Sequence, residues 1–309
     1  MKKLSIVIPT YNEEENVENA YDRILGILEK LPKYDYEIIF SDNDSSDQTV
    51  ENLRKLASED EKLKVIVNNR NFGLDASVFN AMSATSGDAV IWLNCDLQEP
   101  PEMIAKFVTL WEQGNLVIWG QKNASLENPF MYAIRRLYYK LIKVFADVPQ
   151  YSHVIGIGLY DRRVLDEIRL LRDPNPILRN IVPNLGYKPV LVPYVQSVRK
   201  KGKSSYNFFR YFDYALNSLV HSTKAPMKIM LYTGIFCGVG SFLIGVFYFV
   251  YKLLYWDSFA MGMAPLIIFL SFTASVQMFF LGLIGEYLLA VLDRVSFTKH
   301  VVEKERINF

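Results

Sequence analysis

Two long uncharged runs in the last third of the chain constrain its fold most strongly. Residues 229–251 read IMLYTGIFCGVGSFLIGVFYFVY and hold no charge, and 258–285 is a second such run. As a helix rising 1.5 Å per residue, the first run would span about 35 Å, enough for a bilayer core of about 30 Å. The alternative is a pair of buried core helices, but soluble cores seldom contain such runs. We therefore expect a membrane region at 225–292, with a hairpin of two transmembrane helices at about 229–251 and 262–287.

Basic residues flank both runs. Lys224 and Lys228 precede the first, and Arg294, Lys299, Lys304 and Arg306 follow the second. Because basic residues tend to stay on the cytoplasmic side of membrane spans, both ends of the chain are expected in the cytoplasm. The chain would then be a multi-pass membrane protein with a large N-terminal part on the cytoplasmic side.

Upstream of this region, short apolar runs alternate with helical segments. Strands are expected at 4–8, 36–41, 63–67, 88–93, 115–120 and 154–160. The alternation predicts a mostly parallel, doubly wound α/β sheet, and the continuous apolar strands indicate burial on both faces. This domain would occupy residues 1–205. An amphipathic helix at 206–224, lying on the membrane or packed on the domain, and a cytosolic tail at 293–309 complete the expected organisation.

Polar side chains follow the first four strands at one predicted edge of the sheet. They are Pro9 to Glu13, Asp42 to Asp44, Asn68 to Asn71, and the set Asn94, Asp96 and Gln98. Ligands of doubly wound sheets bind beyond the carboxyl ends of the strands. A single aspartate there is commonly only a turn residue, but Glu13, Asp42 and Asp96 come from three separate loops. Such carboxylates would together suit a hard divalent cation that bridges phosphates.

Two features of the charge distribution bear on the possible binding partners. Lys+Arg number 34 and Asp+Glu 33, so the net charge gives no indication of a nucleic-acid partner. Arg199, Lys200, Lys201 and Lys203 cluster just before the membrane-proximal helix. They would clamp a phosphate at the membrane surface, contact anionic lipid headgroups, or form a solvated loop.

Several segments, taken in order, resemble one enzyme family. They are LSIVIPTYNEEEN, IIFSDNDSSDQT, NRNFG, SGDAVIWLNCDLQEPPEMI, the R-x-x-G-x-S loop from Arg199 to Ser204, and LGLIGEYL at 281–288. Over almost the whole chain they resemble the polyisoprenyl-phosphate glycosyltransferases. These are inverting family-two enzymes related to dolichol-phosphate mannose synthase and to bacterial undecaprenyl-phosphate glucosyltransferases.

The resemblance implies a Rossmann-like GT-A fold and a defined reaction. A sugar, expected as a UDP-hexose, would pass from its nucleotide to undecaprenyl phosphate or another polyprenyl phosphate. The reaction would take place at the cytoplasmic face of a bacterial inner membrane, with membrane lipids and a possible homo-oligomer as partners. Because the second pKa of a phosphate monoester is about 6, this acceptor is already an anion at neutral pH. Its attack on the anomeric carbon would need positioning and charge neutralisation rather than a strong general base.

The resemblance also implies roles for individual residues. The nucleotide pocket would be lined by Pro9, Tyr11, Glu13, Asp42, Asp44 and Asn71. Asn94 and Asp96 would hold Mg²⁺ or Mn²⁺ together with the donor diphosphate, in an element that ends at Gln98. Arg199 and Lys203 lie where the family handles phosphate charge. Asp96, Gln98, Arg199 and Lys203 are thus the catalytic candidates.

Three departures from the family pattern leave other hypotheses open. Asn94 stands where the family has an aspartate, so the metal loop loses one negative charge. Asp44 replaces a glycine, and aspartate tolerates the left-handed backbone conformation better than most residues. Gly156 and Gly158 stand where many bacterial members carry the aspartate and arginine of G-D-F-R. A non-catalytic relative that scaffolds or regulates glycan assembly, or a transferase with a non-lipid acceptor, therefore stays possible.

One further spacing invites comparison with another group of enzymes. Gln196 and Arg199 match the Q-x-x-R of the Q-x-x-R-W motif of processive polysaccharide synthases. Lys200 occupies the tryptophan position, and two membrane helices are too few for a translocating channel. We interpret this match as a coincidence of spacing.

Overall fold

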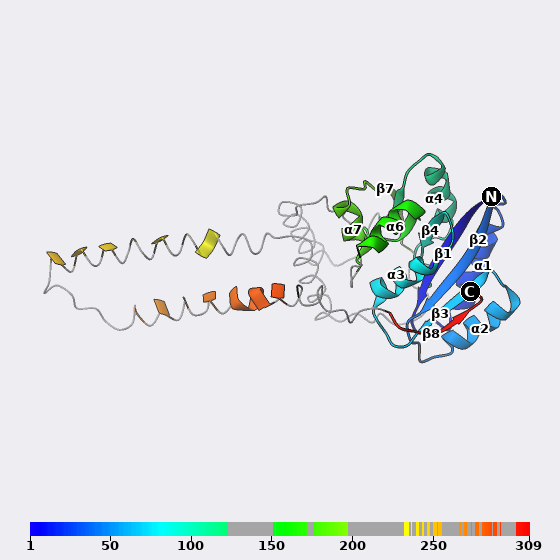
Figure 1. Cartoon of the computed structure of the whole chain (residues 1–309), viewed down its shortest axis with the longest axis horizontal. Helices are drawn as coiled ribbons and strands as arrows, with labels where there is room; N and C mark the ends of the chain where they lie inside the picture. Colours follow the sequence, from blue (N-terminus) through cyan, green and yellow to red (C-terminus); the bar gives the residue numbers. More distant parts are fainter. Residues whose placement is uncertain are drawn as a thin grey trace. The chain divides into compact units, whose positions relative to one another are not determined.

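The computed structural model describes residues 1–122, 151, 153–171, 176–196 and 301–309, together with positions scattered between 232 and 291. The chain divides into two units (Figure 1). The first comprises Met1–Tyr139, Val148–Tyr206 and Ser296–Phe309, and the second comprises Lys140–Asp147 and Asn207–Val295. The chain therefore leaves the first unit twice, after Tyr139 and after Tyr206, and returns to it with its last residues.

Within the described residues, the first unit is built on one eight-stranded sheet in the order β7-β5-β6-β4-β1-β2-β3-β8. The strands are β1 (Lys2–Thr10), β2 (Tyr34–Asp42), β3 (Leu63–Asn68), β4 (Ala89–Trp92), β5 (Val117–Lys122), β6 (Gly158–Asp161), β7 (Val190–Tyr194) and β8 (Glu303–Ile307). Four neighbouring pairs are parallel, while β6 and β8 run antiparallel to their neighbours. The predicted mostly parallel α/β sheet is thus confirmed.

Helices cover both faces of this sheet (Figure 1). They are α1 (Val17–Leu28), α2 (Thr49–Glu59), α3 (Leu74–Ala84), α4 (Met103–Glu112), α6 (Arg162–Leu170) and α7 (Leu178–Asn184). Because β2 and β4 flank β1 on opposite sides, right-handed crossovers place α1 and α2 on one face and α3 on the other. Every residue of β4 is consequently buried, and β1 and β2 are buried apart from their first two and first three residues.

A strand near the C-terminus closes one edge of the sheet, which the sequence analysis did not foresee. β8, red in Figure 1, pairs antiparallel with β3, with Val65 opposite Ile307. An ion pair of 2.6 Å joins Arg54 to Glu305. The Asn308 amide donates to the carbonyl oxygens of Ala57 and Leu63, at 2.7 and 2.8 Å. Part of the expected cytosolic tail is therefore an integral piece of the first unit.

The membrane predictions fall mostly on residues outside the described ones. Every described position between 232 and 291 is helical. Among the residues that the structure describes, we find no helix whose length and apolar character would carry it across a bilayer. The expected helix at 206–224 lies entirely outside the described residues, as do about half of the positions of the two expected spans. These assignments stay predictions.

Candidate active site

The carboxyl ends of the first strands meet at one edge of the sheet, as predicted. Thr10, the last residue of β1, lies opposite Asp42, the last residue of β2. The Leu93 amide, just beyond β4, donates to the carbonyl oxygen of Val7 in β1 at 3.1 Å. The loops after β1, β2, β3 and β4 therefore leave the sheet side by side, and their side chains can form a single site.

Asp42 organises the loop after β2 from a fully buried position. Its carboxylate accepts hydrogen bonds from the Ser45 hydroxyl at 2.5 Å and the Ser45 amide at 2.9 Å. The Thr10 hydroxyl donates to it at 3.3 Å. Burial raises the pKa of the Asp42 carboxyl, although these hydrogen bonds oppose the rise. Asp44 in the following turn has φ of 67°, the left-handed conformation that aspartate tolerates better than most residues.

Hydrogen bonds join the loop after β1 to the loop after β2. The Asn12 side-chain oxygen accepts from the Ser46 amide at 2.8 Å. The Glu13 amide donates to the Thr49 hydroxyl at 2.9 Å, and the Glu13 carboxylate accepts from the Asn16 side chain at 2.5 Å. The loop that carries Tyr11 and Glu13 is thus fixed to the residues that follow β2. The Tyr11 side chain is 45% exposed.

An amide network connects the loops after β2 and β3. The buried Asn43 donates to the Asn71 side chain at 2.9 Å and accepts from Asn68 at 3.2 Å. Asn71 also accepts from the Gly73 amide, at the start of α3, at 2.9 Å. Asn71, a predicted pocket residue, is therefore fixed in place. The sequence analysis placed Asn43 at this edge but gave it no role in the site, although its position directly after Asp42 was a usable signal.

The loop after β4 holds its polar residues on one side. The Leu97 amide donates to the Asn94 carbonyl at 3.5 Å, and the Gln98 amide donates to the Asp96 carboxylate at 3.2 Å. Leu97 has φ of 52°, which is unusual for a bulky residue. Asn94, Asp96 and Gln98 are half-buried, whereas the residues between them are buried. The three predicted side chains are thus more accessible than the residues between them.

Glu99 is the residue of this loop that the sequence analysis left without a role. It is only 2% exposed, and the Tyr194 hydroxyl donates to its Oε1 at 3.3 Å. Within the described part of the chain, its Oε2 has no hydrogen-bond partner. Burial and then the nearby charge of Asp96 raise the pKa of Glu99 to about 7, against weaker lowering by the Tyr194 and Asn94 side chains. A carboxylate placed between Gln98 and a double proline was the available signal.

The segment just after β7 also contacts this loop. The Gln196 side chain donates a hydrogen bond to the Gln98 side-chain oxygen. Gln196, whose spacing to Arg199 we interpreted as a coincidence, therefore lies beside a predicted site residue. Arg199 and Lys203 lie outside the described residues, so their assignment to phosphate stays a prediction.

The predicted gathering of Glu13, Asp42 and Asp96 around one cation is wrong. No group of three or more His, Cys, Asp or Glu side chains in the described part of the chain could hold a metal ion. The physical reason is that Asp42 is fully buried with both carboxylate oxygens bonded by Ser45 and Thr10, so that it is not available to a cation. The Glu13 carboxylate accepts from Asn16 within its own loop. The smaller pair, Asn94 and Asp96, still fits a divalent metal. Mg²⁺ keeps several waters and takes only one or two protein carboxylates when substrate phosphates complete its shell.

The two glycines that replace the family's aspartate and arginine are required by the packing. A Cβ at Gly158, in β6, would lie 2.0 Å from the carbonyl oxygen of Ile118 in β5. A Cβ at Gly156, where φ is 102°, would lie 3.0 Å from the Trp92 ring. No side chain fits at Gly158 without displacing the adjacent strand.

Comparison with known proteins places this site in a family. A mannosyltransferase from Pyrobaculum calidifontis, solved with GDP-Man and Mn²⁺, has a TM-score of 0.47 and 17% identity over 94% of this chain and 87% of its own. The uncharacterized glycosyltransferase YkcC of Bacillus subtilis is 29% identical over 94% of this chain and 90% of its own. The bactoprenol glucosyl transferase of Shigella phage SfV is 28% identical over 98% of this chain and 99% of its own. The family model for glycosyl transferase family 2 matches residues 5–169, more than half of the chain. The chain therefore belongs to glycosyl transferase family 2 and is a glycosyltransferase.

Proposed function

We propose that this enzyme transfers a hexosyl group from a UDP-hexose to undecaprenyl phosphate, with inversion, at the cytoplasmic face of a bacterial inner membrane. The observation that carries the proposal is the extent of similarity to the bactoprenol glucosyl transferases. The family model ends at residue 169, whereas the relative from phage SfV aligns with 98% of this chain. The shared part therefore includes the apolar last third, where a lipid acceptor would be met.

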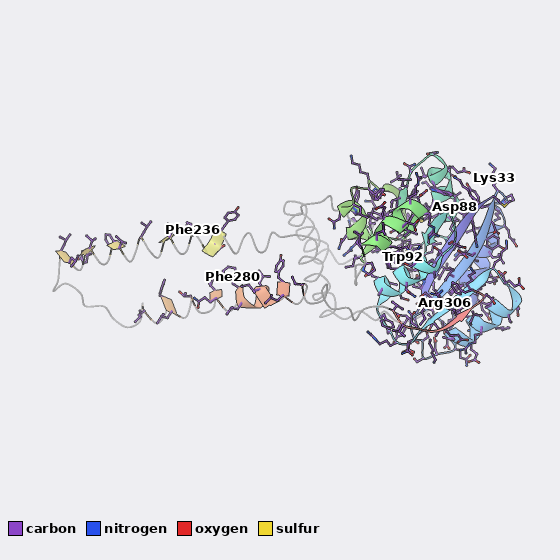
Figure 2. The ribbon with its side chains drawn as sticks, viewed as in Figure 1. Lys33, Asp88, Trp92, Phe236, Phe280 and Arg306 are labelled. Carbon is purple, nitrogen blue, oxygen red and sulfur yellow. The ribbon has the colours of Figure 1, made fainter. Side chains whose placement is uncertain are left out.

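Exposed apolar side chains in the second unit support a membrane anchor. Among its described positions, Phe236 is 79% exposed, Leu254 71% and Leu288 64% (Figure 2 labels Phe236). Soluble monomers rarely expose many large apolar side chains together, because each costs free energy in water. In lipid these side chains would be solvated. We assign this unit to a hairpin of two spans at about 229–251 and 262–287, preceded by the membrane-proximal helix at 206–224.

The described edge of the sheet supplies the donor side of the reaction. We assign the nucleotide to the loops after β1, β2 and β3, which carry Pro9, Tyr11, Glu13, Asp42, Asp44 and Asn71. Their loops are cross-linked by hydrogen bonds, so the pocket is largely formed before the donor arrives. Asp96 and Asn94 would hold Mg²⁺ or Mn²⁺, which when bound neutralises the charge of the leaving diphosphate. Gln98, held by Gln196, would orient the donor.

The acceptor side needs charge and position rather than a base. A lipid phosphate is ionised near neutral pH, so no residue has to remove a proton from the attacking oxygen. This agrees with the glycines at 156 and 158, where neither an acid nor a base can stand. We assign the acceptor phosphate to Arg199 and Lys203, whose cations would also reduce repulsion between acceptor and donor phosphates.

The test is a turnover assay with the full chain purified in detergent. Mn²⁺, undecaprenyl phosphate and a panel of nucleotide-sugars are supplied, and both nucleoside diphosphate and lipid-linked sugar are measured. We expect both products with a UDP-hexose. Transfer only to water-soluble acceptors would instead identify a non-lipid acceptor. Nucleotide binding without turnover for any common donor would favour the non-catalytic scaffold.

A further inference from the structure

The loop that would hold the metal is short of negative charge. Asn94 coordinates only through a neutral amide oxygen, which leaves Asp96 as the single carboxylate of the pair. The other two carboxylates of this edge, Glu13 and Asp42, are engaged by their own loops. Because a divalent cation is held by the charge and number of its oxygen ligands, a second carboxylate close to Asp96 would matter.

Glu99 is buried with half of its hydrogen-bonding capacity unused. Its side chain is 2% exposed, Tyr194 occupies Oε1, and Oε2 has no partner within the described structure. Buried carboxylate oxygens without partners are costly and rare in native proteins, so each calls for an explanation such as an absent ion.

Glu37 shows how this chain treats a buried carboxylate with a purely structural role. Glu37 is 1% exposed, yet both of its oxygens are bonded. Oε1 accepts from the Ser5 hydroxyl at 2.6 Å, and Oε2 lies 2.9 Å from the Lys64 ammonium. Glu99 differs from Glu37 in keeping one oxygen unpaired, a state that it shares among the described residues with Asn68 Oδ1 and Trp92 Nε1.

The free oxygen belongs to a carboxylate that interacts with the metal loop itself. Glu99 directly follows Gln98, whose amide donates to the Asp96 carboxylate at 3.2 Å, and the charge of Asp96 and the Asn94 side chain both influence the pKa of Glu99. Tyr194 fixes the opposite oxygen from β7. We propose that Glu99 is a further ligand of the divalent metal and supplies, through Oε2, the carboxylate charge that Asn94 lacks. This inference rests on the proposed metal-dependent function.

The test measures metal affinity directly, with full-length protein in detergent. Mn²⁺ binding is followed by electron paramagnetic resonance, with Mn²⁺ alone and with Mn²⁺ plus UDP. Glu99→Gln keeps the size of the side chain and removes its charge, and we expect the affinity for Mn²⁺ to fall at least about tenfold. Asn94→Asp added to Glu99→Gln restores a second carboxylate and should recover most of that loss.

The matched control is Glu102→Gln. Glu102 lies on the same segment, but it is exposed and paired with Arg23 at 2.7 Å, so its loss should leave Mn²⁺ affinity unchanged. Thermal unfolding verifies that each variant is folded. If Glu99→Gln does not fold, Glu99→Asp takes its place, because it keeps the charge but withdraws the carboxylate by one methylene, and the same loss is expected.

The outcomes separate this inference from the proposed function. Wild-type turnover with unchanged Mn²⁺ affinity in the Glu99 variant overturns the role of Glu99 and leaves the function intact. A loss that Asn94→Asp does not recover shows that Glu99 acts through the fold rather than as a ligand, and also overturns it. A wild-type protein that binds neither Mn²⁺ nor UDP overturns both proposals.

Discussion

Replacing Glu37 with glutamine tests how the sheet beneath the site is held together. Glu37 lies in β2 and is 1% exposed. Its carboxylate accepts from the Ser5 hydroxyl of β1 and from the Ser86 amide before β4, at 2.6 and 2.7 Å. Lys3 and Lys64 complete its shell at 3.1 and 2.9 Å. One buried anion thus ties together the strands whose ends carry the site.

The pKa of Glu37 gives the size of its contribution to the free energy of unfolding. Burial alone would raise the pKa, but the hydrogen bonds from Ser5, Lys64, Ser86 and Lys3 outweigh it and lower the pKa from 4.5 to about 2. At 1.36 kcal/mol for each pH unit, this corresponds to about 3 kcal/mol of stability from the ionised form. Because the pKa is lower in the folded state, this contribution is complete above pH 4.5 and disappears as the pH falls toward about 2.

Urea unfolding followed by tryptophan fluorescence provides the assay, because Trp92, Trp111 and Trp119 all lie in the first unit. Near pH 7 we expect Glu37→Gln to lower the free energy of unfolding by about 3 kcal/mol, and the gap to the wild type to narrow as the pH falls below 4.5.

The control is Asp35→Asn on the same strand. The ion pair of Asp35 with Lys62 is half exposed, so its removal should change the free energy of unfolding by less than about 1 kcal/mol. A gap between Glu37→Gln and the wild type that stays constant from pH 7 downward would refute the electrostatic reasoning.

Three other perturbations test separate features. Gly158→Ala places a methyl group 2.0 Å from the Ile118 carbonyl oxygen and should destabilise the protein by about 2 kcal/mol or more in thermal unfolding. Gly26→Ala, where a Cβ meets nothing within 4 Å, is its control and should be neutral or stabilising. Asp96→Ala should abolish metal-dependent release of nucleoside diphosphate, and an unchanged rate would remove Asp96 from the site. Deleting residues 301–309 uncovers the edge of β3 and should increase hydrogen exchange there, whereas unaltered protection would show that β8 contributes nothing to the sheet.

Much of the fold could be predicted because its signals are local. The strands expected at 36–41 and 63–67 are observed as Tyr34–Asp42 and Leu63–Asn68. Apolar runs of this length, separated by helical segments, favour a parallel sheet in any context. The left-handed turn at Asp44 was predictable for the same reason, since it depends on the residue itself rather than on distant partners.

The partners of the charged and amide side chains could not be predicted from local patterns. Strand β8 reads EKERI, an alternation of charges that is typical of an edge strand but equally of a solvated tail. Only the pairing with β3 and the hydrogen bond from the Asn308 side chain to the Ala57 carbonyl oxygen show that this segment is an edge strand rather than a solvated tail. The same holds for Asp42, whose type and place suggested a ligand but whose oxygens are taken by Ser45 and Thr10.

The sequence by itself thus determined the α/β sheet, the edge at which its polar loops meet, and membership of a glycosyltransferase family. These follow from patterns within a few residues of one another. Only the tertiary structure decided which carboxylate oxygens remain available to bind a ligand. At Glu99, the Tyr194 hydroxyl bonds one oxygen and the other is unpaired in the described structure. The reason is that the state of a carboxylate depends on burial and on donors from residues far away in the chain, which no local pattern records.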